Sequence, residues 1–384
     1  MSFLSSLLEP AWIKMAYHKE GPLRLAAPLL APLSLFYGFI LILRRLFYRI
    51  GLFSSKSHPI PIISVGNITV GGVGKTPVTL FIAQRLERMG FKPAILLRGY
   101  GRKSNKPFVL HRRNFKKPLV QQYGDEPALL AFLSDFPIGI CSNRSQGVEK
   151  LCAETDCDII LLDDGFQHIR LKRNLDLVVL DGGNPYGNGY CLPYGPLREP
   201  TNALNKADAL IINGEINPDS YSKIQRFDKT IYEGGLEWIG LYPLESWMKQ
   251  IGGIPSSIDK HRGQPVIIAS GIGSPQRLKN QALSHGLVVK DFISYPDHYW
   301  FSKSDLRFLE IKARQHPILI TEKDAIRFFA HQDISRKLVD NTFVIHAAWK
   351  MNQSSRFEHW LDSKIKQIIS DQYDLSVESI PTSE

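Results

Sequence analysis

The sequence of 384 residues predicts an α/β fold, a parallel sheet with helices on both faces. Three observations predict it. An apolar run over residues 61–66 breaks into glycines and ends on Lys75-Thr76, and a second apolar run, the four residues 159–162, ends on two aspartates. Further apolar runs alternate with segments whose apolar residues have helical spacing. In such folds the ligand lies at the carboxyl ends of the strands.

The first run leads into the loop 67–76, and apolar residues at helical spacing follow to about Arg88. A strand that ends in glycines and opens a helix turns backbone N–H groups and the positive helix end toward one point, which favours anions. Lys75 can bridge terminal phosphates, and the Thr76 hydroxyl can ligate Mg²⁺. The general phosphate-loop motif has glycine where Thr69 stands. A glycine-rich turn that binds nothing is therefore the alternative.

Four more runs read as strands and alternate with predicted helices: residues 92–98, 137–141, 175–180 and 209–213. At the tip of the 159–162 strand, Asp163 and Asp164 suit a carboxylate that holds the Mg²⁺ bound to Thr76. A plain capping role is the alternative. Arg198 and Glu199 follow a later strand, where they can neutralise phosphate and share the metal, or form only a surface ion pair.

The residues alone do not decide the roles of two other pairs of polar side chains. Asp125 and Glu126 begin a predicted helix, where carboxylates are commonly caps that favour the helix dipole. Asp297 and His298 precede another predicted helix and can be a simple helix entry.

Composition bounds the class of protein. Lys plus Arg exceed Asp plus Glu by 47 to 37, and the excess gathers in residues 1–60 and in residues 98–118. The second stretch holds eight basic residues and no acid. Such patches meet phosphates on nucleic acid, lipid or a small ligand, although a solvated surface hairpin would look the same. The four cysteines lack metal spacing, and we expect reduced thiols of a cytosolic protein.

The chain is long enough for about two domains. We expect a membrane-associated helical segment at 1–57, a nucleotide-binding core at 58–215 and a smaller α/β domain at 216–384. The pattern loosens after Ile216, Gly252-Gly253 suggests a linker, and the polar tail after Asp371 suggests a loose end.

The N-terminal segment has no charged residue from 25 to 43, and Arg44, Arg45 and Arg49 follow at once. Three interpretations compete. A spanning helix needs about 20 apolar residues. An amphipathic helix in the headgroup layer fits the prolines and the arginines better. A helix packed on the core is the third. No clear cleavage site indicates a removed signal.

Two other phosphate-loop classes lack their signatures here. A guanine-nucleotide switch carries NKxD after a strand, whereas residues 205–208 spell it before the apolar run. A partitioning ATPase has lysine where Val70 stands.

Seven motifs, in this order, resemble the tetraacyldisaccharide 4′-kinase family of lipid A synthesis. They are NITVGGVGKT (67–76), RGYGR (98–102), GDEP (124–127), DDGFQH (163–168), LREP (197–200), PDH (296–298) and TEKD (321–324). This family also departs from the general phosphate-loop motif at the position of Thr69, so the missing glycine fits the resemblance.

The resemblance implies transfer of the γ-phosphoryl group of ATP, with Mg²⁺, to the 4′-hydroxyl of an acylated glucosamine disaccharide 1-phosphate. The expected place is the cytoplasmic face of the inner membrane of a Gram-negative bacterium, with peripheral or monotopic attachment. No nucleic acid and no obligate protein partner are expected. The rival hypothesis is a membrane-associated ATPase or GTPase that acts on a protein partner.

The resemblance also assigns roles to residues of this chain. The catalytic residues are Asp125, His298 and Lys75. The nucleotide-binding residues are Thr69, Val70, Gly71, Gly72, Val73, Gly74, Lys75 and Thr76. The metal-site residues are Thr76, Asp163, Asp164 and Glu199. The residues expected at phosphates or acceptor are Arg98, Tyr100, Arg144, Gln167, His168 and Arg198.

Overall fold

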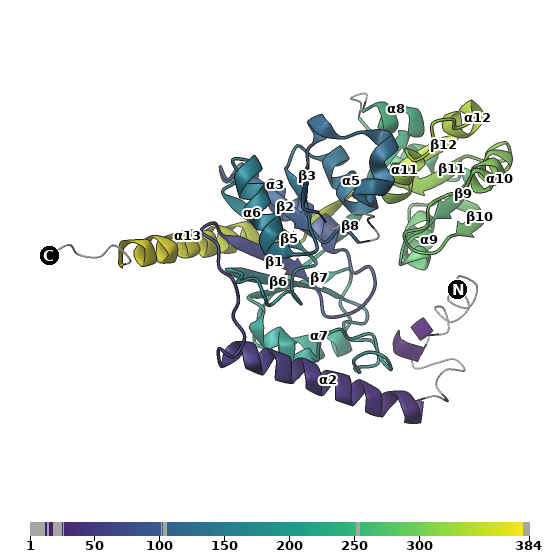
Figure 1. Cartoon of the computed structure of the whole chain (residues 1–384). Helices are drawn as coiled ribbons and strands as arrows, with labels where there is room; N and C mark the ends of the chain where they lie inside the picture. The colour runs from purple at the N-terminus through teal and green to yellow at the C-terminus, as the bar shows by residue number, and fades with distance from the viewer. Residues whose placement is uncertain are drawn as a thin grey trace. The chain divides into compact units, whose positions relative to one another are not determined.

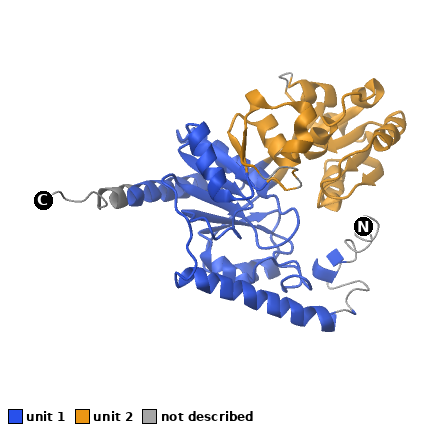
Figure 2. Cartoon of the chain, viewed as in Figure 1, with its two compact units in different colours: residues 1–98, 141–235, 349–384 blue, residues 99–140, 236–348 orange. Residues whose placement is uncertain are grey.

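The computed structural model describes residues 12–13, 15–17, 25, 27–100, 102, 106–250 and 254–378, with side chains described to residue 372. The chain forms two compact units, shown in blue and orange in Figure 2. Unit 1 comprises Met1–Arg98, Cys141–Gly235 and Trp349–Glu384, and unit 2 comprises Gly99–Ile140 and Leu236–Ala348.

Unit 1 contains a parallel sheet in the order β8-β7-β6-β1-β5-β2 (Figure 1). Its strands are β1 (Ile62–Gly66), β2 (Pro93–Leu97), β5 (Ile159–Asp163), β6 (Leu175–Asp181), β7 (Ala209–Asn213) and the start of β8 (Thr230–Pro243). Every residue of β1, β2, β5 and β7 is buried, as expected for a sheet covered on both faces. The predicted fold class is confirmed.

Helices of unit 1 accompany this sheet (Figure 1). They are α2 (Ala27–Arg49), α3 (Lys75–Arg88), α6 (Arg144–Glu154), α7 (Pro218–Gln225) and α13 (Ser354–Glu378). The prediction of a loose tail after Asp371 is wrong as far as the description reaches, because α13 continues to Glu378. Phe357, Leu361 and Ile365 recur every four residues and are fully buried. They anchor the helix from which the polar end extends.

Unit 2 contains four neighbouring strands in the order β10-β9-β11-β12, joined in parallel pairs. They are β9 (Pro265–Ser270), β10 (Val288–Ser294), β11 (Ile318–Thr321) and β12 (Thr342–Met351). Its larger helices are α5 (Asp125–Leu133), α9 (Pro275–Ser284), α10 (Lys303–Ala313) and α11 (Glu322–Phe328), with shorter helices α4 (Val120–Tyr123), α8 (Leu244–Lys249) and α12 (Arg336–Asp340).

Two local predictions need revision. The chain does not loosen from Ile216 to Pro255, because α7, β8 and α8 fill most of that stretch; Gly252 and Gly253 lie outside the described residues. The basic segment from Arg98 forms more than a hairpin. Its strand β3 (Phe108–Leu110) pairs antiparallel with β4 (Ile138–Ile140), and short 3-10 helices follow β3; residues 101 and 103–105 lie outside the description.

The compact units do not follow the predicted ranges 1–57, 58–215 and 216–384. Residues 99–140, placed in the nucleotide core by the sequence, belong to unit 2, and the C-terminal residues from Trp349 return to unit 1. The three ranges remain a prediction about functional parts.

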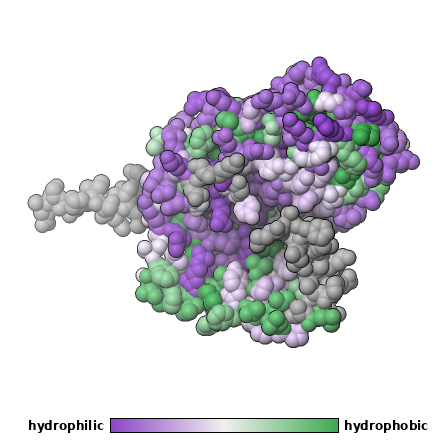
Figure 3. Space-filling model, turned by 45° about the vertical axis from the view of Figure 1, so that its right-hand side comes forward, coloured by the Kyte–Doolittle hydropathy of each residue, from purple (hydrophilic) through white to green (hydrophobic). Residues whose placement is uncertain are grey.

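Helix α2 has an unusual distribution of side chains. Its buried positions are Ser34, Gly38, Leu41 and Arg45, so the packed face is largely small or polar. Apart from Arg49 at its end, its exposed positions are apolar: Leu35, Phe36 and Phe39 are 66%, 63% and 59% exposed. Among the described residues α2 is the one helix long and apolar enough to cross a membrane. The green surface along the bottom of Figure 3 lies where Figure 1 shows α2.

Candidate active site

The loop between β1 and α3 has the backbone of an anion site. Gly71 and Gly74 have φ of +100° and +87°, which side-chain-bearing residues rarely adopt. A Cβ on Gly74 would lie 2.7 Å from Nδ2 of Asn213, so only glycine fits there. Gly74 caps α3, whose first N–H groups are free of helix partners and available to an anion.

Hydrogen bonds from three directions fix this loop. Asn67 Nδ2 donates to the Thr69 carbonyl at 2.8 Å, and Asn213 Nδ2 donates to the Val73 carbonyl at 3.0 Å. The segment 196–198 runs beside the loop, since Val70 N donates to the Pro196 carbonyl and Arg198 N to the Ile68 carbonyl. Backbone hydrogen bonds therefore hold the LREP motif against the phosphate loop.

Thr76 and Asp163 are in contact. The Thr76 hydroxyl donates to Asp163 Oδ2 at 2.8 Å, and the Thr79 hydroxyl donates to Oδ1 at 3.2 Å. Strands β1 and β5 are neighbours with Val65 opposite Asp163, so the two polar ends meet at one edge of the sheet. The sequence motifs 87 residues apart thus form one cluster.

Asp164 gathers two cations beside the loop. Arg198 Nη1 and Nη2 donate to its two oxygens at 2.9 and 2.7 Å, and Lys75 Nζ lies 3.6 Å from Oδ1. Burial alone would raise the pKa of the Asp164 carboxyl, but Arg198 and Lys75 outweigh it and hold the pKa well below its usual range. Arg198 also donates to Asn67. Lys75, Arg198 and Asp164 form one charged cluster.

Glu199 has a different partner from the one that the sequence suggested. Its carboxylate is 1% exposed and accepts from Arg45 Nε of α2 at 2.8 Å. Both Nη atoms of Arg45 are buried without a hydrogen-bond partner. In this structure Glu199 ties α2 to the LREP segment, and a metal role for it remains a prediction.

The other residues expected at phosphates are held by backbone carbonyls. Arg144 is 2% exposed and donates to the Cys141 and Asp163 carbonyls at 3.0 and 3.2 Å, and Gln167 Nε2 donates to the Asn67 carbonyl at 2.6 Å. Burial lowers the Arg144 pKa to about 10. Burial, then the charges of neighbouring arginines, lowers the His168 pKa to about 4, so that imidazole is neutral near pH 7. Arg98 is exposed after β2.

A second cluster lies wholly in unit 2. Asp125 begins α5 and is 6% exposed. His298 Nδ1 lies 2.9 Å from Oδ2 and 3.1 Å from Oδ1 of Asp125, so the predicted pair is in contact across 173 residues of chain. His298 has φ of +58°, an uncommon backbone for histidine that aims its ring at Asp125. The exposed Tyr100 ring lies 6.2 Å from the His298 ring.

The charges around this pair shift both pKa values. Burial alone would raise the pKa of the Asp125 carboxyl, but the His298 hydrogen bond and the charges of Lys323 and Arg327 hold it well below its usual range. The hydrogen bond to Asp125 raises the His298 pKa above its usual value. The pair is therefore an ionised carboxylate beside an imidazole that protonates readily.

The chain is similar to known proteins along most of its length. Residues 26–366 match the model of the family described as tetraacyldisaccharide-1-P 4′-kinase. The tetraacyldisaccharide 4′-kinase of Shewanella pealeana is 33% identical over 94% of this chain and 99% of its own length. That of Methylobacillus flagellatus is 36% identical over 79% and 83%. The chain belongs to the tetraacyldisaccharide 4′-kinase family.

A solved structure adds to this. LpxK from Aquifex aeolicus, crystallised in complex with ATP, matches with a TM-score of 0.67 and 28% identity over 88% of this chain and 98% of that one. The prediction of a kinase of lipid A synthesis is confirmed by the family, and ATP binding is supported by this relative.

Sequence reasoning missed three side chains that the structure adds to this family member's clusters. Arg327, fully buried on α11, contacts Asp125; Asn213, at the tip of β7, holds the loop; and Arg45 pairs with Glu199. The one available signal was Arg327, three residues after Asp324 and so on the same helix face as the TEKD motif. The other two partners are distant in sequence.

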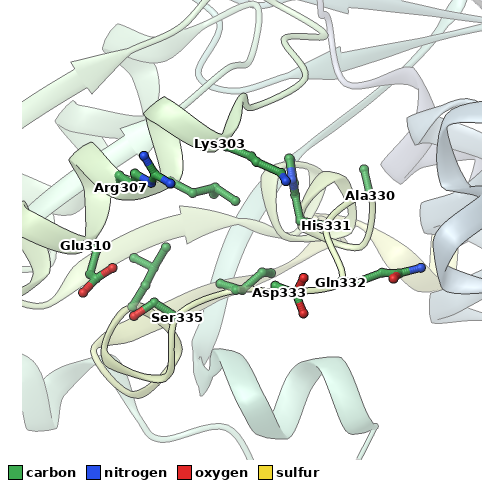
Figure 4. Close-up of a pocket in the computed structure, with 11 residues that line it drawn as sticks. Lys303, Arg307, Glu310, Ala330, His331, Gln332, Asp333 and Ser335 are labelled. Atoms are coloured by element: carbon green, nitrogen blue, oxygen red, sulfur yellow. The ribbon is translucent and has the colours of Figure 1, made fainter.

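Unit 2 also has a pocket of about 730 Å³ that shares no lining residue with these clusters (Figure 4). Lys303 and Arg307 of α10 and residues 330–335 line it. It contains none of the residues that resemblance to the kinase family assigns to the site.

Proposed function

We propose that this chain transfers the γ-phosphoryl group of ATP to the 4′-hydroxyl of a tetraacyldisaccharide 1-phosphate, forming lipid IVA. The observation that carries the proposal is the contact of Thr76 with Asp163 beside a glycine loop that opens α3. Family membership supplies the acceptor, since the relatives are named for that substrate.

In this proposal the nucleotide binds in unit 1. Backbone N–H groups of residues 69–76 surround the phosphates, and Lys75 neutralises the charge that builds up during transfer. Arg198 is already positioned by Asp164, and Lys75 lies beside it. The incoming phosphates must compete with Asp164 for these cations, so the site selects a ligand with a high negative charge.

The residues present also fit Mg²⁺. The hard oxygen donors Thr76 and Asp163 are in contact, and Asp164 is adjacent, which suits a metal that keeps several waters and phosphate ligands. Among the described residues no group of three or more His, Cys, Asp or Glu side chains is arranged to hold a metal by itself. When bound, Mg²⁺ would neutralise phosphate charge. Glu199 would join only by releasing Arg45.

Asp125 is the proposed base for the acceptor hydroxyl, and His298 orients it. A carboxylate with so low a pKa is a weak base, so it does little to the hydroxyl before transfer begins. This suits phosphoryl transfer, whose loose transition state needs the proton removed late. The main task of Asp125 is then to orient the hydroxyl by accepting its hydrogen bond.

Membrane attachment through α2 is part of the proposal. The apolar exposed side chains and the polar packed face argue against a helix buried in a protein core. Ser34 and Arg45 bond to the rest of unit 1, and Gly38 between them is buried, which favours a helix lying in the headgroup layer over one that crosses the bilayer. An acyl disaccharide stays in the bilayer, and the proposed place is the cytoplasmic face of the inner membrane.

Vesicle flotation tests this attachment. Phe36→Glu puts a charge on the exposed apolar face of α2, and we expect the vesicle-bound fraction to fall by roughly tenfold. Leu283→Glu, a similarly exposed position on α9, is the control and should float as the parent does. Equal binding of all three proteins would rule out α2 as the attachment.

The decisive test of the reaction follows the label of [γ-³²P]ATP. Transfer to an extracted acyl disaccharide 1-phosphate, sensitive to Lys75→Ala, is the expected result. Release of label only to water, in the presence of that acceptor, would instead favour a membrane-associated ATPase.

A further inference from the structure

Arg327 of α11 contacts the proposed base through the core of unit 2. Its side chain is completely buried, and it lies 202 residues from Asp125 in the sequence. Nε and Nη2 both donate to Asp125 Oδ2, at 3.0 and 2.6 Å. Two N–H groups of the guanidinium therefore donate to the same carboxylate oxygen. The other oxygen, Oδ1, accepts a hydrogen bond from the Glu126 N–H at 2.9 Å.

The rest of the guanidinium is fixed as well. Nη1 donates to the Gly271 carbonyl at 2.7 Å and to Asp324 Oδ1 at 3.2 Å. Asp324 is itself buried and accepts from the Ser270 hydroxyl and the Gly271 N–H, both at 2.9 Å. All three guanidinium nitrogens are engaged, so Arg327 cannot turn without breaking this network.

We propose that Arg327 is a positioning residue for phosphoryl transfer, one that holds Asp125 ionised and in a single orientation toward the acceptor hydroxyl. This rests on the proposed role of Asp125 as the base. A planar fork is suited to the task, because it fixes direction as well as charge, whereas an ammonium group fixes only charge.

A purely structural ion pair explains the arrangement less well. Arg327 already has a buried counter-ion in Asp324, so it does not need Asp125 for neutrality. Buried ion pairs are weak contributors to stability, and apolar replacements are often as stable. Asp125 also sits at the surface end of the network, beside the half-exposed His298, whereas Asp324 and Arg327 are fully enclosed. The hydrogen bonds of Arg327 thus connect the buried Asp324 to Asp125, the proposed base.

The charged groups that face Asp125 predict what the loss of Arg327 would do to this carboxylate. Cations come from Arg327 and Lys323 on α11 and from His298 when protonated; the nearby anions are Glu126, Asp297 and Asp324. Lys323 is partly neutralised by Glu126 at 2.9 Å. Removing the Arg327 charge therefore leaves the carboxylate with less compensation, and the pH below which the pair takes up a proton must rise.

Arg327→Gln and Arg327→Lys test this in the full chain with ATP, Mg²⁺ and acyl disaccharide 1-phosphate. For Gln we expect kcat to fall by roughly 10²-fold, the KM for ATP to change by less than about twofold, and the acidic limb of the kcat profile to move up by about one pH unit. For Lys, which keeps the charge but loses the fork, we expect a fall of roughly tenfold with the limb near its original pH.

The control is Arg336→Gln, which removes an exposed arginine of α12 paired with Glu245 in the same unit. It should leave kcat and the limb unchanged. Loss of turnover with an unmoved acidic limb in Gln, or wild-type turnover in Lys, would overturn the proposal. If the Gln protein does not fold, the Lys protein decides alone. A wild-type chain that transfers no phosphate to the acceptor would defeat the proposed function instead.

Discussion

The two clusters of this kinase are built from different groups. In unit 1 the loop between β1 and α3 offers mainly backbone groups, and its cations Lys75 and Arg198 are partly exposed and share one carboxylate. In unit 2 Asp125 is enclosed by side chains from α11 and from the segment before α10. The first arrangement is suited to a ligand that brings much charge, and the second to one hydroxyl.

The difference shows which of the two ligands must be positioned more precisely. Polyphosphate has many oxygens and tolerates small shifts, so N–H groups on a helix end are sufficient. A sugar hydroxyl offers one proton in one direction, so its base must be held from several sides. We therefore expect damage to unit 2 to affect turnover alone, and damage to the loop to affect binding too.

Asp125→Asn is the sharpest way to separate the two clusters. The amide keeps the shape but cannot take a proton, and we expect kcat to fall by ~10²–10⁴-fold. ATP affinity, measured by calorimetry, should stay unchanged because the proposed nucleotide contacts lie in unit 1. Asp135→Asn, an exposed carboxylate just beyond α5, is the control. Turnover retained by Asp125→Asn would remove Asp125 from the chemistry.

Lys75→Ala should affect both binding and turnover. A hydrogen bond to a charged group contributes about 1.5–3 kcal/mol, so ATP should bind roughly 10–100-fold more weakly, and kcat should fall as well. Calorimetry and the ³²P assay measure the two effects. Lys92→Ala removes an exposed lysine paired with Asp156 and should change neither. Unchanged ATP affinity in Lys75→Ala would contradict the proposed nucleotide site.

The smallest effect concerns stability and pH. The His298 pKa is raised in the folded chain, so its pairing stabilises the fold fully below the unfolded pKa, about 6.5, and loses that contribution as pH rises through the folded value. Thermal melts of the parent and of His298→Asn should therefore differ more at pH 6 than at pH 9. A difference that is the same at both pH values would show that the pair does not stabilise the fold by charge.

Much of unit 1 was predictable because its signals are local. The loop, its helix and the strand tip at Asp163 each occupy a few consecutive residues, and parallel strands necessarily bring their carboxyl ends to one edge. The contact between Thr76 and Asp163 follows from that geometry. The Asp164 and Arg198 pair follows less directly, since it depends on the backbone bonds that bind segment 196–198 to the loop.

The rest depends on contacts that no local pattern reveals. Arg327 resembles any arginine of a short helix until Asp125 is placed beside it, and Glu199 has its partner 154 residues away on α2. The compact units differ from the predicted ranges for the same reason. Residues 99–140 and the C-terminal helix join units on the basis of contacts distant in sequence.

The outward apolar face of α2 has a consequence for how such an enzyme finds its acceptor. On the proposed placement, enzyme and lipid share a thin layer, so they meet by lateral diffusion and the surface density of lipid, rather than its bulk concentration, sets the encounter rate. Dilution with inert phospholipid at constant total acceptor would then slow turnover.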